Sequence, residues 1–520
     1  MLDQIQALRW FCDRQAFDQS TTDAGNEMPA SRRSNSRMVR PSVIVALALV
    51  LLGVLFTAKD VRLPILRNSL VYARTVQNLE LHHLALWEVC SDPAQVHSQG
   101  CGFSVLALPF TRMTGLNVGL KLASCFATAL FILAMIAFFQ RFNASFNLRE
   151  EDLPLELVVA CFNPLVIAQF WSAYSDSAFG ASFLVSFVLL DKLLKDRVSK
   201  VATALAYTLT VMLAVFTRPA GLVLYPLHLL YGLWHRRQIV EIARRDSRRF
   251  FLLVASAALL AAWVGLGKLG HNPLLNINKG EYDIPVTYLS SVNGMIALLV
   301  LTFGVLLVVA APRIAVTRES APLFAVLAAY MHIFMVFHAS IFNLRFFIPV
   351  FPLMALVIVS ALRSVKRKRL VAACVATYAL MNGATIFAFN DTVAYRFFTR
   401  ISTHRINWGE FGRFDNLRIG VHVRMQEALD RLNAEVPRGG SLQYVTPYYE
   451  GVAQGIYQGS GLLRPDIQIH YAKRLEDLGP LPEDAWIFLP EKISRHPADP
   501  PGSSSPWLIH GSTRLSNLQQ

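Results

Sequence analysis

The chain has 520 residues, of which 54% are hydrophobic and 16% charged, and its mean hydropathy is +0.40. These values exclude a soluble globular protein and indicate a polytopic membrane protein. The net charge of +14 does not indicate nucleic-acid binding. The basic residues lie in short clusters between apolar stretches, which is where membrane topology places them.

The first 40 residues are polar and rich in serine and arginine, so we expect a disordered tail. The apolar stretch at 41–58 has no small-residue cleavage site after it and is predicted to be an uncleaved first span. A long polar loop at 59–115 follows. Ten later stretches are long enough to cross a bilayer, which makes about eleven spans. They lie at 116–139, 155–173, 177–194, 201–217, 219–234, 250–267, 292–311, 321–340, 346–362 and 370–389.

Clusters of arginine and lysine occur between alternate spans, on the same side as the arginines that precede the first span. Basic residues accumulate in cytoplasmic loops, so this side is predicted to be cytoplasmic. The loop at 59–115 and residues 391–520 then lie on the opposite side. We expect a transmembrane domain at 41–390 and a soluble domain at 391–520.

After the last span, proline, glycine and charged residues become more frequent and the apolar stretches shorten. Strands are predicted at 441–447, 466–472 and 484–490, with a short helix at 449–459. The fold class is therefore an all-α polytopic membrane protein with a small C-terminal α/β domain.

Two of the six cysteines, Cys90 and Cys101, share the loop at 59–115. An oxidising compartment would allow them to form a disulfide that holds this loop over the membrane face. Two unpaired thiols are the alternative.

Charged residues at the outer ends of spans are costly in a membrane, so each is a candidate functional residue. Asp176 lies between the third and fourth spans, Arg218 between the fifth and sixth, and Arg345 at the entry to the tenth. All three share the side of the first loop. Arginine binds phosphate through paired hydrogen bonds and stabilises charge on a leaving phosphate. The set indicates glycosyl transfer from a lipid-phosphate sugar. The alternatives are a helix cap for Asp176 and interfacial anchors for the arginines.

The order of these motifs resembles the GT-C superfamily of glycosyltransferases, which includes protein O-mannosyltransferases, aminoarabinose transferases of lipid A and oligosaccharyltransferases. The similar features are an acid-bearing first outer loop, a Tyr-x-Asp turn at 174–176, Thr-Arg-Pro at 217–219 and Arg-Phe-Phe-Ile-Pro at 345–349. The resemblance covers roughly residues 41–390. It implies a polyprenyl-phosphate donor, a catalytic acid in the first loop, inversion at the sugar carbon and a place in a bacterial-type inner membrane.

One position departs from that pattern. Family members often carry an acid before a tyrosine-containing helix in the first loop, and the matching segment at 68–79 has Asn68 in its place. An amide cannot act as a base, so Asp60 is predicted to be the base, unless it is only an interfacial charge. The other acids of the loop are the alternatives: Glu80, Glu88 and Asp92.

The predicted reaction is a single displacement on the periplasmic face, in which Asp60 removes a proton from an acceptor hydroxyl. Asp176 would support this base or hold a divalent metal ion with His83, and Arg218 and Arg345 would bind the donor phosphate. Further substrate contacts are expected from Tyr72, Tyr174 and Glu80. The acceptor would be a lipid-linked glycan, a lipid or a protein, and the N-terminus would be cytoplasmic.

Two other functions remain open at this stage. A lipid or glycan transporter would have internal repeats and acids near mid-membrane. A non-catalytic assembly partner would keep the fold without the base, as Asn68 suggests. Convergence of Asp60, Asp176, Arg218 and Arg345 on one outward cavity would favour the enzyme.

Overall fold

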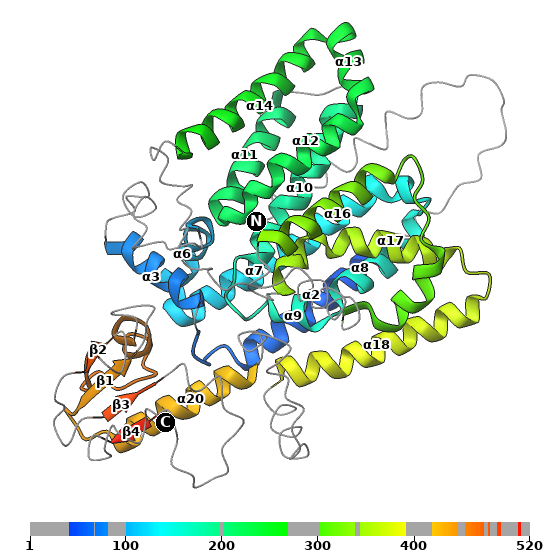
Figure 1. Ribbon diagram of the computed structural model, residues 1–520. Coiled ribbons are helices and arrows are strands. Elements are labelled where there is room, and N and C mark those ends of the chain that lie inside the picture. Colours follow the sequence, from blue (N-terminus) through cyan, green and yellow to red (C-terminus); the bar gives the residue numbers. More distant parts are fainter. Residues whose placement is uncertain are drawn as a thin grey trace, which may run out of the picture. The chain divides into compact units, whose positions relative to one another are not determined.

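The protein is described here by a computed structural model (Figure 1). The structure describes residues 41–66, 68–81, 100–196, 201–268, 302–337, 344–391, 419–445, 453–472, 477–478, 486–489 and 508–510. Several residues singled out from the sequence lie outside these ranges: His83, Glu88, Cys90 and Asp92.

Within these ranges, five helices are long and apolar enough to cross a membrane, and four shorter apolar helices accompany them. These nine coincide with nine of the predicted spans, so a polytopic helical fold is confirmed, while the count of eleven stays a prediction. The long helices are α2 (Pro41–Lys59), α7 (Leu116–Phe142), α10 (Asp176–Lys195), η7 with α17 (Leu344–Val350 and Phe351–Arg363) and α18 (Lys368–Asn390). The shorter ones include α11 (Val201–Thr217), α14 (Ser247–Lys268) and α16 (Ala321–Phe337).

Two predicted spans are wrong as continuous helices. The stretch at 155–173 breaks into α8 (Leu153–Cys161) and α9 (Pro164–Ala168). Pro164 has no N–H to continue the helix, and Asn163 caps the new start by accepting a hydrogen bond of 3.0 Å from the Val166 amide. The stretch at 219–234 begins with a 3-10 turn, η4 (Pro219–Val223), before α12 (Leu224–Trp234).

In the described part of the first loop there are two helices, α3 (Asn68–Leu81) and α6 (Gly102–Thr114). Helix α3 covers the segment matched above to the tyrosine-containing helix of the GT-C pattern. Helix α6 turns into α7 at Gly115 and packs closely against it. A Cβ on Gly119 would lie 2.3 Å from the Thr111 Cα, so this contact requires glycine.

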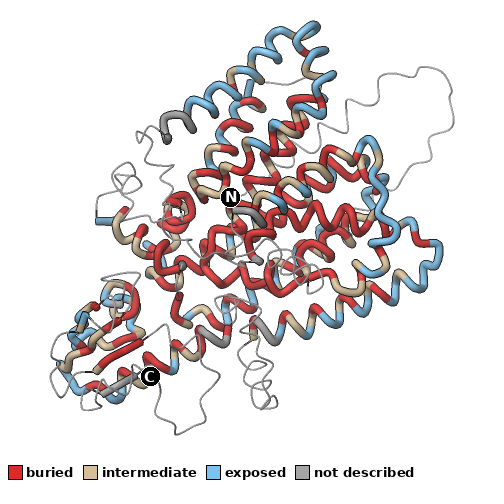
Figure 2. Tube along the Cα trace, in the orientation of Figure 1, coloured by how far each residue is buried: buried red, intermediate tan, exposed pale blue. Residues whose placement is uncertain are grey.

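The helices differ in how deeply they are buried (Figure 2). In the span that ends with α17, 94% of the apolar window is buried, compared with 22% in α18. Helix α17 therefore lies inside the bundle, with α7, α8 and α10 packed around the same core. The exposed leucines of α2 and α18 are suited to contact lipid.

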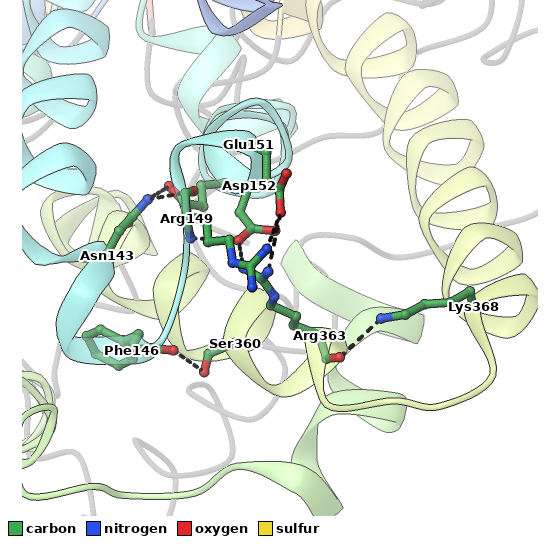
Figure 3. Close-up of polar contacts among 9 residues, drawn as sticks. Asn143, Phe146, Arg149, Glu151, Asp152, Ser360, Arg363 and Lys368 are labelled. Carbon is green, nitrogen blue, oxygen red and sulfur yellow. Dashed lines mark hydrogen bonds and ion pairs between the residues drawn. The ribbon is translucent and has the colours of Figure 1, made fainter. Parts of the chain in front are cut away.

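Predicted cytoplasmic residues from two distant segments meet at one end of the bundle (Figure 3). Arg363, which ends α17, binds Asp152 and lies 3.3 Å from Glu151, both in η3 (Glu150–Asp152). Arg149 lies 3.4 Å from the same Glu151 carboxylate. Arg149 and Arg363 belong to two of the basic clusters predicted to be cytoplasmic, so these clusters lie on the same side of the bundle, as the sequence predicts. The orientation of the chain in the membrane stays a prediction.

The described residues from 419 onward, called the C-terminal domain below, form a four-stranded sheet in the order β2-β1-β3-β4. The domain boundary at 390/391 stays a prediction. The three predicted strands are confirmed. Strand β1 is parallel to β2 and β3, and β3 is antiparallel to β4. The predicted helix at 449–459 is a short π-helix, η9 (Ala453–Gln458), and α20 (Ile419–Glu435) precedes the sheet. The strands are β1 (Ser441–Val445), β2 (Gln468–Ala472), β3 (Trp486–Phe488) and β4 (Leu508–His510).

Candidate functional site

Three of the charged residues selected from the sequence lie together at one end of the bundle. Asp176 begins α10, Arg218 lies between α11 and η4, and Arg345 lies in η7. The three residues are only 1%, 6% and 3% exposed, respectively. Asp176, Arg218 and Arg345 therefore form one buried cluster, whereas their convergence with Asp60 on one outward cavity, and the roles of all four, stay predictions.

In this cluster one carboxylate bridges two guanidinium groups. Arg218 Nη1 bonds to Asp176 Oδ1, and Arg345 Nε lies 3.6 Å from Asp176 Oδ2, which is an ion-pair distance. Two positive charges against one negative charge leave the cluster with a net charge of +1. A buried net charge is costly unless other groups compensate it.

Aromatic rings supply part of that compensation. The Arg345 guanidinium carbon lies 4.2 Å from the centroid of the Tyr174 ring, and the Arg218 guanidinium carbon lies 4.1 Å from that of Phe346. Each cation–π contact contributes about 0.5–2 kcal/mol, more where water is excluded. Phe346 is fixed through its backbone, because Tyr330 donates a 2.6 Å hydrogen bond to its carbonyl.

The first loop contributes Tyr72 of α3. Its hydroxyl lies 2.6 Å from Ser175 Oγ, one residue before Asp176. Burial raises the pKa of the Tyr72 phenol, and the Arg218 charge opposes this rise. Tyr72 is therefore a neutral hydroxyl within reach of the charges of the cluster. Ser104 of α6 donates a 3.2 Å hydrogen bond to the Tyr72 carbonyl and holds this part of α3 in place.

The turn that presents Tyr174 and Asp176 has an unusual backbone. Ala173 is buried at φ +57°, a left-handed conformation that alanine rarely adopts. The neighbouring Ser172 carbonyl accepts a 2.8 Å hydrogen bond from Ser69 Oγ of α3. The surrounding contacts thus maintain a strained turn, which is typical of functional sites.

Arg218 is positioned by close backbone packing. A Cβ on Gly102 would lie 2.8 Å from the Thr217 Cα, and a Cβ on Gly100, at φ +76°, would lie 2.8 Å from the Phe216 carbonyl oxygen. Cys101, between the two glycines, is disulfide-bonded. Its partner lies outside the described residues, as does Cys90, so the pairing of Cys90 with Cys101 stays a prediction.

Asp60 lies in the loop at 60–66, which follows α2, and is 8% exposed. Lys121 of α7 is completely buried, and its amine donates to the carbonyls of Asp60 (3.0 Å) and Leu63 (2.7 Å). Asp60 as the base stays a prediction. Sequence reasoning missed Lys121, although a lysine inside an apolar span signals a buried polar partner.

Glu80, a predicted substrate contact, lies near the end of α3. It is partly exposed and pairs with Arg112 at 3.8 Å.

The predicted metal site involves Asp176 and His83. The parts of the chain that the structure describes contain no group of three or more His, Cys, Asp or Glu side chains suited to a metal ion. His83 lies outside them, and the Asp176 carboxylate is already engaged by two cations. A metal ion held by Asp176 and His83 stays a prediction.

Comparisons with known proteins give a structural likeness only. No family model matches the chain, and no curated protein matches it significantly. The fold is similar to that of ArnT from Cupriavidus metallidurans. The apo crystal structure of that protein has a TM-score of 0.44 at 16% identity, with 75% of this chain and 71% of ArnT covered. The crystal structure with bound undecaprenyl phosphate has a TM-score of 0.45 at 15% identity, with 76% and 72% covered.

Proposed function

We propose that the protein is an inner-membrane glycosyltransferase that moves a sugar from a polyprenyl-phosphate donor to an acceptor hydroxyl on the periplasmic face, with inversion. The observation that carries the proposal is the buried Asp176–Arg218–Arg345 cluster at one end of the bundle. A polyprenyl chain lies in the bilayer, so its phosphate is at the depth where the spans end.

The charge of the cluster favours an anionic ligand. Among the described residues, its two guanidinium groups and one carboxylate carry a net charge of +1, and all three side chains are nearly excluded from water. A phosphate monoester or diester would neutralise this charge and accept paired hydrogen bonds from arginine. Asp176 holds the two guanidinium groups about one point, and a bound phosphate would share them with this carboxylate.

The proposed reaction is a single displacement. Asp60 takes the proton of the acceptor hydroxyl, and the hydroxyl oxygen attacks the anomeric carbon from the face opposite the phosphate. The bond between this carbon and the phosphate oxygen breaks, and its electron pair stays on the phosphate. Arg218 and Arg345 stabilise the charge that grows there, and loss of one such donor typically lowers kcat by about 10²–10³. No step of this scheme uses a metal ion.

The other substrate contacts follow from the same geometry. Tyr174 lies against Arg345, and Tyr72 bonds to Ser175, so both line the cluster. We propose that the acceptor, a lipid-linked glycan, a lipid or a protein, approaches from the side of the first loop and the C-terminal domain.

Transfer of radiolabelled sugar tests the function. Purified protein in lipid is supplied with a panel of polyprenyl-phosphate sugars and a native membrane extract as acceptor. We expect transfer by the wild type, about 10² or more lower kcat for Arg345→Gln, and unchanged transfer for Arg313→Gln. Arg313 is a matched control because it is exposed and its guanidinium donates to the Val309 carbonyl of its own segment. Absence of transfer from every donor by folded protein would favour a transporter or a non-catalytic partner.

A further inference from the structure

We propose that His422 and Tyr457 of the C-terminal domain are positioning residues that hold the 60–66 loop, and with it Asp60, over the membrane domain. The proposal rests on the proposed function through the role of Asp60. It deepens that function by assigning the C-terminal domain a part in assembling the active site.

The membrane side of the loop is held by α7. The Lys121 amine binds the Asp60 and Leu63 carbonyls, as described above. The side chain of Asn117, which is 3% exposed, donates to the Leu63 carbonyl at 3.0 Å and accepts a 3.0 Å hydrogen bond from the Ile65 amide. These two polar side chains sit at the start of an apolar helix, where they would be costly without the loop.

The opposite side of the loop is held by the C-terminal domain. His422 Nδ1 of α20 lies 2.7 Å from the Pro64 carbonyl, and the Tyr457 hydroxyl of η9 donates to the Ile65 carbonyl at 3.2 Å. A carbonyl only accepts, so His422 Nδ1 carries the proton in this contact. Both side chains are buried, at 2% and 0% exposure. The domain therefore contacts the loop through two buried polar side chains.

His422 also contacts the segment that leads to Asp176, in addition to the loop that carries Asp60. Its ring packs edge-on against Trp171, with 5.0 Å between the ring centroids. Trp171 belongs to the segment that leads into the Asp176 turn and donates a 2.8 Å hydrogen bond to Asn390 at the end of α18. One imidazole thus contacts both the loop that carries Asp60 and the segment that carries Asp176.

The contacts leave the loop little freedom. Four successive carbonyls, from Arg62 to Ile65, each accept a hydrogen bond from a side chain of α7 or of the C-terminal domain. Pro64 cannot donate to a regular hydrogen-bonding pattern, so these side chains replace the bonds that secondary structure would provide. A small displacement of a catalytic group lowers the rate by about 10²-fold. The four hydrogen bonds to the loop would prevent such a displacement of Asp60.

The test uses full-length protein in lipid nanodiscs and three variants, His422→Ala, His422→Asn and the control His470→Ala. His470 is exposed on β2 of the same domain. For His422→Ala we expect amide hydrogen exchange in residues 60–66 to become about tenfold faster or more, since a buried carbonyl loses its donor. We also expect kcat to fall while the Kd for undecaprenyl phosphate is unchanged. His422→Asn keeps an N–H donor and should restore both properties in part.

The outcomes separate this proposal from the proposed function. If the wild type transfers no sugar, the exchange measurement still decides whether His422 holds the loop. Unchanged exchange in His422→Ala would overturn the proposal, as would faster exchange with wild-type kcat. A parallel loss of affinity for undecaprenyl phosphate would also overturn it, because the variant would then have lost the fold of the whole site.

Discussion

Replacing Asp176 with asparagine removes the carboxylate that two buried guanidinium groups share. The change raises the charge of the Asp176–Arg218–Arg345 cluster from +1 to +2 at positions that are at most 6% exposed. Breaking a buried ion pair by removing one partner costs about 3–5 kcal/mol. Because the three residues are nearly excluded from water, solvent screening does not reduce this estimate appreciably. We therefore expect Asp176→Asn to lower the unfolding temperature substantially.

The same variant should bind anions more tightly. In the wild type, Asp176 competes with a phosphate for Arg218 and Arg345, and asparagine removes that competition. At a concentration about 100 times its Kd, a ligand that binds only the folded state adds about 2.7 kcal/mol. Undecaprenyl phosphate should thus restore much of the lost stability, and its Kd should be lower for Asp176→Asn than for the wild type.

The assay is thermal unfolding in nanodiscs, with and without undecaprenyl phosphate, for the wild type, Asp176→Asn and Asp430→Asn. Asp430 is an exposed acid on α20 and serves as the control. An unfolding temperature of Asp176→Asn equal to that of the wild type would refute the buried-charge reasoning. Weaker binding of the lipid phosphate by the variant would refute the assignment of the cluster to a phosphate.

Three further predictions concern the supports of the site. Gly102→Ala should weaken undecaprenyl phosphate binding by about tenfold, because its Cβ would lie 2.8 Å from the Thr217 Cα and displace the adjacent Arg218; wild-type affinity in a binding titration would contradict this. Lys121→Met should destabilise the fold by about 3 kcal/mol, since buried carbonyls lose their donor, and denaturant unfolding measures the effect. Ala173→Gly should raise the unfolding temperature slightly, because about 1 kcal/mol of backbone strain at φ +57° is relieved; a clear decrease would argue against strain at this turn.

The convergence of Asp176, Arg218 and Arg345 could be predicted because topology alone limits where span ends lie. A residue at the end of a span has only two possible sides, and alternation of basic clusters assigns one. The same reasoning did not identify which side chains contact Asp176, Arg218 and Arg345, or how deeply these three residues are buried. Asn163 and Pro164 did signal the break at 155–173, but a hydropathy window averages over composition and does not register a helix cap.

The support of the 60–66 loop could not be predicted from the sequence. His422 and Pro64 are 358 residues apart, and Lys121 appeared only as one charge inside an apolar stretch. A contact between residues so far apart in the sequence depends on how α20 packs against the membrane domain. No local sequence pattern encodes that packing. The three C-terminal strands were found because alternation and turn residues are local signals.

Binding of undecaprenyl phosphate is the most direct test of the central claim that two buried arginines bind a lipid phosphate. The measurement is a titration in nanodiscs with the wild type, Arg218→Gln, Arg345→Gln and the exposed control Arg313→Gln. We expect at least about tenfold weaker binding for each of the two buried-arginine variants, and wild-type affinity for the control. Equal affinity in all four proteins would contradict it.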